Sequence, residues 1–533
     1  MRILFVWTNK DQMGYKPLAI ALLAPILRAH GHEVALFDTT FIDTGHVDDT
    51  EDGMRVRIFK KMDWEGHDRR KKKTTIQIDL LAKLIEFRPE VVLVSALSDE
   101  IQIGFEVSRV VKWWDSSIQI IWGNKAVTTE PGRILENRNI DFGCIGEGIE
   151  AVPELLWCFQ DGGDPEDVQN MAFRRDGGGI QINPLRPYFQ DLDSLPYLDW
   201  SLFDRRHLIK PFDGKPRVGG DSMIGWGCPN VCTYCINEPT RELYGNHAGK
   251  YMRRYSVDRI IKELKHLRDT WGLNLIIFHD EDFTAKPDTY LAALAEAYSR
   301  DVNVPFAAMV NAKHINEKTL EYLKRMNCLS VSMGIETGNT FLRKSVLKRT
   351  ETKEEIINAF TLLNKAGIRT SSFNMLGIPH ETRKTLEETA ELNRLAQPRF
   401  PNSVYFYPYK GTKLGDFAIQ QGMFDPNSTA VYEQDRPTLT LSTISTEELV
   451  AFRDRFVLYV KMPKRYQKII RRSERNDNLG IILTRKLFSI YDDYVLEHNG
   501  IWNPDEREED RIRELCGLIT PETTKKWNDE VKK

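Results

Sequence analysis

Short apolar runs alternate with amphipathic segments over residues 1–160. Ile3–Trp7 and Val91–Val94 are strand-like runs, whereas Leu18–His30 and Ile76–Phe87 show helical periodicity. This alternation predicts βαβ units and a doubly wound parallel sheet of the α/β class. Such sheets bind ligands beyond the carboxyl ends of their strands. The residues at this predicted edge are Ser95, Leu97, Ser98, Gly123, Asn124, Gly146 and Glu147.

A second alternation occupies residues 221–425. Six predicted strands, the first at Met223–Trp226, alternate with five helices. The pattern predicts a partial (β/α)6 barrel of the TIM type, with an active site at the carboxyl ends of its strands. Residues 161–220 are rich in Gly, Pro and Asp and predict a linker. Residues 426–533 predict a helical C-terminal domain.

Composition and charge narrow the functional class. Of the 533 residues 28% are charged, and 77 acidic residues against 74 basic ones give a net charge of −3. This balance provides no overall field that would attract nucleic acid, so we expect no nucleic-acid partner and only local binding. The longest apolar stretch, near Leu18–Leu27, contains Pro25 and is too short for a membrane span. Because no signal-peptide pattern is present, we expect a cytoplasmic protein.

Three of the seven cysteines fall in one short segment, Cys228-Pro-Asn-Val-Cys232-Thr-Tyr-Cys235, after the first predicted barrel strand. An odd number of cysteines in a long chain does not indicate a disulfide framework, and this spacing points to a metal site. Three thiolates in this arrangement can each hold one iron of a cubane cluster, which leaves the fourth iron open. The alternatives are buried free cysteines and a structural zinc site, which usually requires a fourth Cys or His nearby.

This loop, with Tyr234 before its last cysteine, resembles the signature of the radical S-adenosylmethionine (SAM) enzymes, and the resemblance extends over the predicted barrel. It implies that Cys228, Cys232 and Cys235 bind a 4Fe-4S cluster whose open iron is chelated by SAM. An electron from the cluster then cleaves SAM to methionine and a 5′-deoxyadenosyl radical. A flavodoxin or ferredoxin is the implied electron donor.

Further segments resemble the SAM-binding segments of this family. Phe278-His-Asp-Glu-Asp-Phe283 follows the second predicted barrel strand, and its carboxylates suit the positive charge of the SAM ammonium. Asp280 and Asp282 share strand parity and are the predicted contacts, with a solvated turn as the alternative, whereas His279 has the opposite parity. The other residues that the resemblance assigns to SAM are Glu336 in Gly334-Ile-Glu-Thr-Gly338, and Asn374 and Gly377 in Asn374-Met-Leu-Gly-Ile-Pro379. A helix-capping role is the alternative for Glu336.

The N-terminal domain is similar to the Rossmann-like cobalamin-binding domains of B12-dependent radical SAM enzymes. Gly146-Glu-Gly-Ile-Glu150 resembles their GEGE-type segment, and the loops at Ser95–Ser98 and Gly123–Asn124 match the places where such domains approach cobalamin. The sequence lacks the DxHxxG motif whose histidine binds cobalt in mutases. The alternative is a Rossmann-like domain that binds a partner or the substrate instead of a cofactor.

The resemblance therefore implies a cobalamin-dependent radical SAM enzyme. The main hypothesis is a methyltransferase acting at an unactivated carbon or phosphorus centre, in which one SAM methylates cobalamin and another supplies the radical. The first alternative is oxidative cyclisation or rearrangement without methyl transfer. A more remote one is a non-enzymatic iron–sulfur sensor or scaffold.

Overall fold

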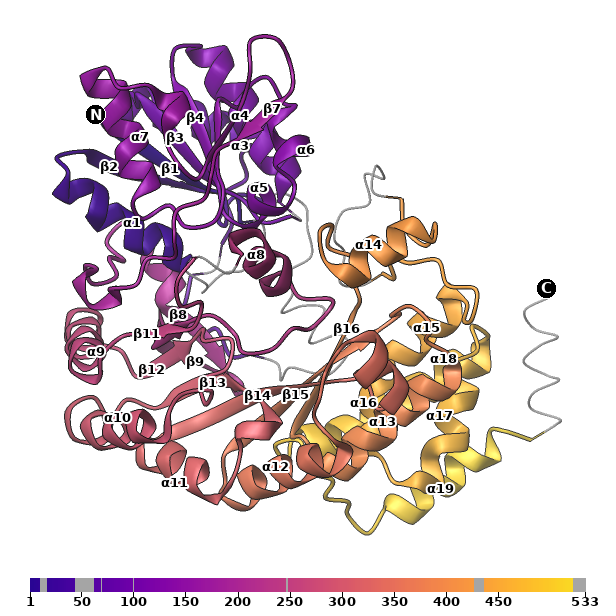
Figure 1. Cartoon of the computed structure of the whole chain (residues 1–533). Helices are drawn as coiled ribbons and strands as arrows, with labels where there is room; N and C mark the ends of the chain where they lie inside the picture. The colour runs from indigo at the N-terminus through magenta and orange to yellow at the C-terminus, as the bar shows by residue number, and fades with distance from the viewer. Residues whose placement is uncertain are drawn as a thin grey trace. The chain divides into compact units, whose positions relative to one another are not determined.

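The computed structural model describes residues 1–9, 17–43, 62–68, 70–98, 100–245, 248–425 and 436–520. The chain forms two compact units. The first unit contains the N-terminal sheet and continues to Phe306, with Tyr409–Asp416 added; the second contains Ala307–Pro408 and the chain from Phe417 onward. Figure 1 follows the chain through these elements.

The N-terminal sheet is mostly parallel. Its strands are β1 (Arg2–Trp7), β2 (Glu33–Asp38), β3 (Val91–Ser95), β4 (Gln119–Gly123), β5 (Phe142–Cys144), β6 (Met171–Arg174) and β7 (Ile180–Ile182), in the order β2-β1-β3-β4-β5-β6-β7. The pairs among β1 to β5 are parallel, which confirms the predicted α/β domain. β6 and β7 add antiparallel strands, so part of the predicted linker belongs to this sheet.

Tight packing holds the N-terminal sheet against its helices. These helices are α1 (Leu18–Ala29), α3 (Ile76–Phe87), α4 (Ile101–Trp114), α5 (Lys125–Thr129), α6 (Pro131–Leu135) and α7 (Ala151–Asp161). Trp122 of β4 is fully buried, and its indole N–H donates to the hydroxyl of Ser108 at 3.0 Å. A Cβ at Gly104 would lie 2.4 Å from the same ring. Glycine therefore allows α4 to approach β4 closely.

The second sheet is a half-barrel. Its strands are β8 (Ile209–Phe212), β9 (Lys215–Ser222), β12 (Leu275–Phe278), β13 (Phe306–Val310), β14 (Cys328–Glu336), β15 (Arg369–Leu376) and β16 (Phe400–Tyr405), in the order β16-β15-β14-β13-β12-β9-β8. The helices between the strands are α9 (Val257–Trp271), α10 (Asp288–Asp301), α11 (Glu317–Arg325), α12 (Lys353–Lys365) and α13 (Arg383–Ala396). The six strands from β9 onward follow chain order, which confirms the predicted partial (β/α)6 barrel.

The predicted first strand of the barrel was wrong. Met223–Trp226 contributes only the short β10 (Gly225–Trp226), whereas β9 pairs in parallel with β12. The sequence of β9 contains Gly219 and Gly220, which are poor strand formers. Both are required here, because a Cβ would lie 2.3 Å from the Lys210 side chain at Gly219 and 2.2 Å from the Trp200 ring at Gly220.

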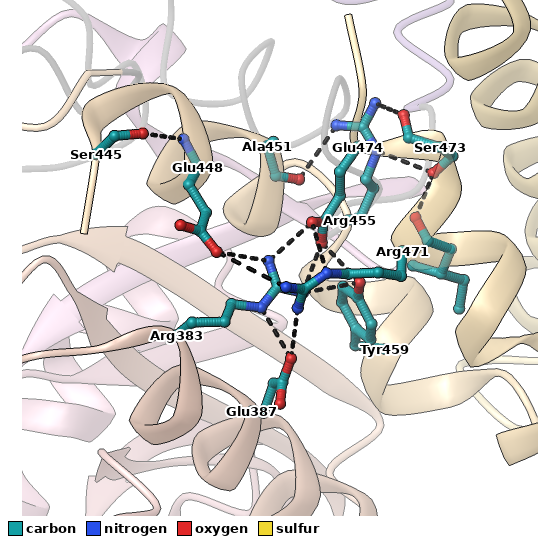
Figure 2. A network of polar contacts seen from close by, with 11 residues as sticks. Arg383, Glu387, Ser445, Glu448, Ala451, Arg455, Tyr459, Arg471, Ser473 and Glu474 are labelled. Carbon is teal, nitrogen blue, oxygen red and sulfur yellow. Dashed lines mark hydrogen bonds and ion pairs between the residues drawn. The ribbon is translucent and has the colours of Figure 1, made fainter. Parts of the chain in front are cut away.

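The C-terminal segment is helical, as predicted. Its helices are α15 (Thr446–Arg453), α16 (Phe456–Lys461), α17 (Gln467–Ser473), α18 (Asn478–Tyr491) and α19 (Glu508–Gly517). Of these, α16 packs on α13. A polar network, shown in Figure 2, connects α15, α16 and α17 to α13. Arg383 donates to both carboxylate oxygens of Glu474, at 2.8 and 2.9 Å, and to the hydroxyl of Tyr459 at 3.0 Å. Arg471 joins the network through Glu387 at 2.6 Å.

None of the helices in the described part of the chain is long and apolar enough to cross a membrane.

Arg383 and Arg471 belong to the same network but differ in exposure, with side chains 14% and 50% exposed. Replacing Arg383 by Gln leaves Glu474, only 9% exposed, without its main partner. We expect Arg383→Gln to destabilise the protein by roughly 3 kcal/mol, and the exposed-site control Arg471→Gln by less than about 1 kcal/mol. Urea unfolding followed by circular dichroism measures both. Equal shifts of the two midpoints would contradict the prediction.

Candidate functional site

The cysteine loop lies between two short elements of the first unit. It follows β10, which pairs antiparallel with β11 (Arg253–Arg254), and it precedes α8 (Asn237–Tyr244). The amide of Cys235 donates to the carbonyl oxygen of Cys232 at 3.1 Å. Cys232 is buried, whereas Cys228 and Cys235 are partly exposed. Tyr234, in the same loop, is also partly exposed.

Burial and nearby charges determine the protonation state of the thiols. Burial raises the pKa of Cys228 and of Cys235, the latter to about 11, and the Glu281 carboxylate adds to both shifts. Lys125, the first residue of α5, opposes the shift at Cys235. The thiols are therefore neutral in the protein alone, and a bound metal would favour the thiolate form. Because Lys125 follows β4 and its charge acts on Cys235, the carboxyl edge of the N-terminal sheet lies beside the cysteine loop.

The donor set fits an iron–sulfur cluster. Each of the three thiolates can bind a different iron of a cubane, and the loop supplies three cysteines rather than the four Cys or His ligands that a structural zinc site usually requires.

Asp280 and Asp282, the two carboxylates after β12 that were predicted to contact SAM, both bind groups of the protein itself. Asp280 is buried, accepts a hydrogen bond from the amide of Ile224 at 2.8 Å and pairs with Lys286 at 3.0 Å. Asp282 is buried too, and accepts from the amide and the hydroxyl of Thr284 at 3.0 and 2.8 Å. Their contact with SAM stays a prediction, and the structure gives each a local structural role.

Glu281 lies between these two aspartates and is exposed. Its charge acts on the thiols of Cys228 and Cys235 and on the hydroxyl of Tyr251, so its carboxylate lies close to the cysteine loop. Parity did not select this residue, because alternation shows which side chains share a face but not which of them are already paired. Glu281 is the accessible carboxylate of this segment.

A charged group lies on the opposite face of the same strands. Asp221 of β9 is register partner of Ile277, and it accepts from Lys210 at 2.7 and 2.9 Å. The ring of His279 lies 2.8 Å from the same carboxylate. Phe278, with the other parity, packs on Tyr298 of α10, so Asp221 and His279 face away from that helix. From the sequence, His279 was predicted only to have the opposite parity to Asp280 and Asp282.

In the second unit, Glu336 ends β14 in a strained backbone conformation. Its φ is 62°, and the register with β15 shifts between Gly334 and Glu336. A Cβ at Gly334 would lie 2.1 Å from the Glu336 carboxylate, so this carboxylate folds back over the glycine. Arg349 lies 3.4 Å from Glu336 and pairs with Glu351 at 2.8 Å. The predicted SAM contact thus already has a cationic neighbour.

Asn374 is directed toward α13. Its amide nitrogen donates to the hydroxyl of Ser372 at 3.1 Å and to the carbonyl oxygen of Asn402 at 2.8 Å, and its oxygen accepts from Asn393 at 2.7 Å. The side chain is fully buried. Any contact with a bound molecule at Asn374 is therefore left to its main chain.

The turn after β15 is held by a buried carboxyl group. Gly377 has φ of 79°, and its amide and that of Ile378 donate to Glu381. A Cβ at Gly377 would also lie 2.9 Å from the side chain of Leu449. Burial raises the pKa of Glu381 to about 8, against these two hydrogen bonds. Glycine and a largely protonated Glu381 together shape this predicted SAM segment.

The carboxyl edge of the N-terminal sheet leaves open space beside Gly123. The side-chain amide of Asn124, a residue with φ of 77°, donates to the hydroxyl of Ser95 at 3.1 Å. The backbone N–H of Leu97 donates to the carboxylate of Glu100 at 3.1 Å. A Cβ at Gly123 would meet no heavy atom within 4 Å. The partly exposed residues of this edge are Leu97, Ser98, Gly123 and Asn124.

Gly146 and Glu147 follow β5 and, unlike the open edge at Gly123, lie against other elements of the protein. The Glu147 carboxylate pairs with Arg253 at 2.6 Å, and the backbone N–H of Glu147 donates to the hydroxyl of Tyr244 at 2.8 Å. These predicted cofactor contacts therefore face α8, which follows the cysteine loop, and β11, which pairs with β10 before the loop.

Comparison with known proteins identifies the two halves of this site. Residues 223–392 match the Radical SAM superfamily, and residues 9–156 match the B12 binding domain. The chain therefore contains a radical SAM domain and a B12-binding domain. The cofactors of such a radical SAM protein are a 4Fe-4S cluster, SAM and cobalamin, which the cysteine loop and the open edge at Gly123 fit.

Relatives of this radical SAM protein cover most of its length. An uncharacterised methyltransferase of Pyrococcus horikoshii is 24% identical over 387 residues, covering 72% of this chain and 82% of the relative. An anaerobic magnesium-protoporphyrin IX monomethyl ester cyclase of Rubrivivax gelatinosus is 23% identical over 430 residues, covering 78% and 69%.

A solved structure shares the fold. The radical SAM methyltransferase TsrM of Kitasatospora setae, with tryptophan and a SAM analogue bound, matches with a TM-score of 0.61 at 14% identity, covering 95% of this chain and 91% of TsrM. A second TsrM structure contains cobalamin and a [4Fe-4S] cluster.

Glu381 makes the stability of the protein depend on pH. In the unfolded chain this carboxyl ionises near pH 4.5, whereas in the folded chain it keeps its proton to about pH 8. The folded state therefore binds more protons in this window, and its contribution to stability, complete below pH 4.5, declines as the pH rises toward 8. We expect Glu381→Gln to remove the decline, as measured by urea midpoints at pH 5 and 8. The exposed-site control Glu354→Gln should retain it, and a decline that persists in Glu381→Gln would contradict the assignment.

The position of Glu281 predicts a role in SAM binding. Removing its charge should weaken SAM binding about tenfold or more, since a hydrogen bond to a charged group is lost, while the iron content stays unchanged. Anaerobic equilibrium dialysis with labelled SAM measures this for Glu281→Gln, with the exposed Glu296→Gln of α10 as control. Equal SAM affinity in both variants would rule out the contact.

Proposed function

We propose that this protein is a cobalamin-dependent radical SAM methyltransferase that acts on an unactivated carbon or phosphorus centre of a small molecule. One observation carries the proposal: a single compact unit contains the three-cysteine loop and the carboxyl edge of a B12-binding domain, with α5 in contact with α8. The methyltransferase relative and the fold shared with TsrM support it.

The chain's own residues would bind and orient the reacting groups. When bound, the cluster supplies the electron that cleaves SAM, and cobalamin supplies the methyl group. Cys228, Cys232 and Cys235 would hold the iron, and Glu281 would bind the ammonium of SAM. The open edge at Gly123 would receive the corrin, and the half-barrel would shield the radical from water.

A second candidate function is oxidative cyclisation, which the cyclase relative favours. The two functions differ in the products of SAM. Methyl transfer forms S-adenosylhomocysteine beside 5′-deoxyadenosine, whereas cyclisation without methyl transfer forms only the latter.

The remaining partners belong to the same proposal. The electron donor would be a flavodoxin or ferredoxin, and the substrate would not be a nucleic acid. Free thiols throughout the described chain suit a reducing compartment such as the cytoplasm.

The cysteine loop gives the direct test. After anaerobic purification with cobalamin supplied, we expect the wild type to contain a 4Fe-4S cluster and cobalamin and to form both 5′-deoxyadenosine and S-adenosylhomocysteine from SAM. Cys232→Ala should lose the cluster and 5′-deoxyadenosine formation, whereas Cys516→Ala, an exposed cysteine of α19, should retain both.

Iron, sulfide and cobalt analysis with product chromatography measures each quantity. If Cys232→Ala formed 5′-deoxyadenosine at the wild-type rate, the cluster assignment would be refuted. Cobalamin-loaded protein that forms no S-adenosylhomocysteine with any candidate substrate would favour the cyclisation alternative.

A further inference from the structure

The loop after β5 is attached to α8 and β11, two elements next to the cysteine loop. It belongs to the N-terminal sheet, whereas its partners Tyr244 and Arg253 belong to α8 and β11. α8 follows Cys235 directly, and β11 pairs with β10, which directly precedes the loop. Both attachments lie within the first compact unit.

The first attachment depends on a glycine. Gly146 has φ of 75°, and a Cβ there would lie 2.1 Å from the hydroxyl oxygen of Tyr244. That hydroxyl accepts the backbone N–H of Glu147 at 2.8 Å. The ring of Tyr244 stacks on Tyr188, with centroids 4.0 Å apart. Any larger residue at position 146 would push the end of α8 away.

The second attachment is an ion pair with little freedom. The Glu147 carboxylate lies 2.6 Å from Arg253 on one oxygen and accepts the amide of Phe189 at 2.9 Å on the other. Arg253 also donates to the carbonyl oxygen of Phe189 at 2.8 Å, and its guanidinium lies over the rings of Tyr188 and Trp226. Its side chain is 5% exposed. A salt bridge held on several sides resists rotation far more than an exposed one does.

We propose that Gly146, Glu147, Tyr244 and Arg253 form a latch that fixes the carboxyl edge of the B12-binding domain relative to the cysteine loop. Its members are positioning residues. The latch sets the separation between cobalamin and cluster-bound SAM, and so rests on the proposed function. Geometry matters at this point, since a displacement of about 1 Å can lower a reaction rate roughly a hundredfold.

The separation itself is the decisive readout. In holoenzyme with cob(II)alamin and a dithionite-reduced cluster, the two paramagnets shorten each other's relaxation according to distance. We expect pulsed EPR to give one narrow separation for the wild type. Arg253→Met, and the milder Tyr244→Phe, which keeps the stacked ring, should give a longer or broader distribution. The control Asp161→Asn, an exposed carboxylate at the end of α7, should match the wild type.

Product formation should also distinguish the latch variant from the wild type. In Arg253→Met we expect S-adenosylhomocysteine formation to fall at least about tenfold, whereas cluster content and SAM-dependent 5′-deoxyadenosine formation stay near wild type. Unchanged separation in both latch variants would overturn the proposal. Loss of cobalamin from these variants with an unchanged separation in the remaining loaded molecules would instead identify a cofactor contact, and would also overturn it.

A measurement without cofactors separates the latch from the proposed function. Hydrogen exchange of the purified chain should show faster exchange at the Glu147 and Phe189 amides in Arg253→Met than in the wild type. Wild-type protein that binds no cobalamin refutes the function, whereas equal exchange in both proteins refutes the latch itself.

Discussion

A buried charge in this protein requires a partner, and that requirement decides which acidic side chains are left for ligands. Removing one member of a buried pair exposes the other to an uncompensated desolvation cost. Asp221 is matched by Lys210, Asp280 by Lys286, and Glu474 by Arg383. Near the cysteine loop, Glu281 is the exposed carboxylate of its segment. The protein thus separates carboxylates that hold the fold from one that can meet a cation.

The sequence predicted the fold well where periodicity has one interpretation. Alternation identified the parallel strands of the N-terminal sheet and the order of the half-barrel. The prediction from alternation failed at β9. Glycine is required at positions 219 and 220 because the side chains of Lys210 and Trp200 lie against the backbone there. Such contacts join residues that are not neighbours in the sequence, and no local pattern contains them. The antiparallel β6 and β7 were missed for a related reason, since short strands rich in turn residues resemble a linker.

The site was predicted at the level of segments rather than side chains. The cysteine spacing is itself the chemical signal, so Cys228, Cys232 and Cys235 needed no tertiary information. Strand parity selected Asp280 and Asp282 as SAM contacts. It cannot show that the Asp280 carboxylate already pairs with Lys286 and that the Asp282 carboxylate already accepts from Thr284. Asn374 presents the same problem, because its partner Asn393 lies on the following helix. A motif identifies where a ligand contact occurs, and packing decides which atom makes it.

A shared fold does not determine the reaction, because a methyltransferase and a cyclase are both relatives of this chain. The elements that bind cluster, SAM and cobalamin can be common to both activities, since each uses the same radical precursor. Lys210, Asp221 and His279 form a polar group on the face of the half-barrel strands turned away from α10. Burying three ionisable groups there is costly unless their charges are matched. Asp221 provides this match by accepting from Lys210 while lying within hydrogen-bond distance of His279, so the group keeps its polarity inside the protein without any bound ligand.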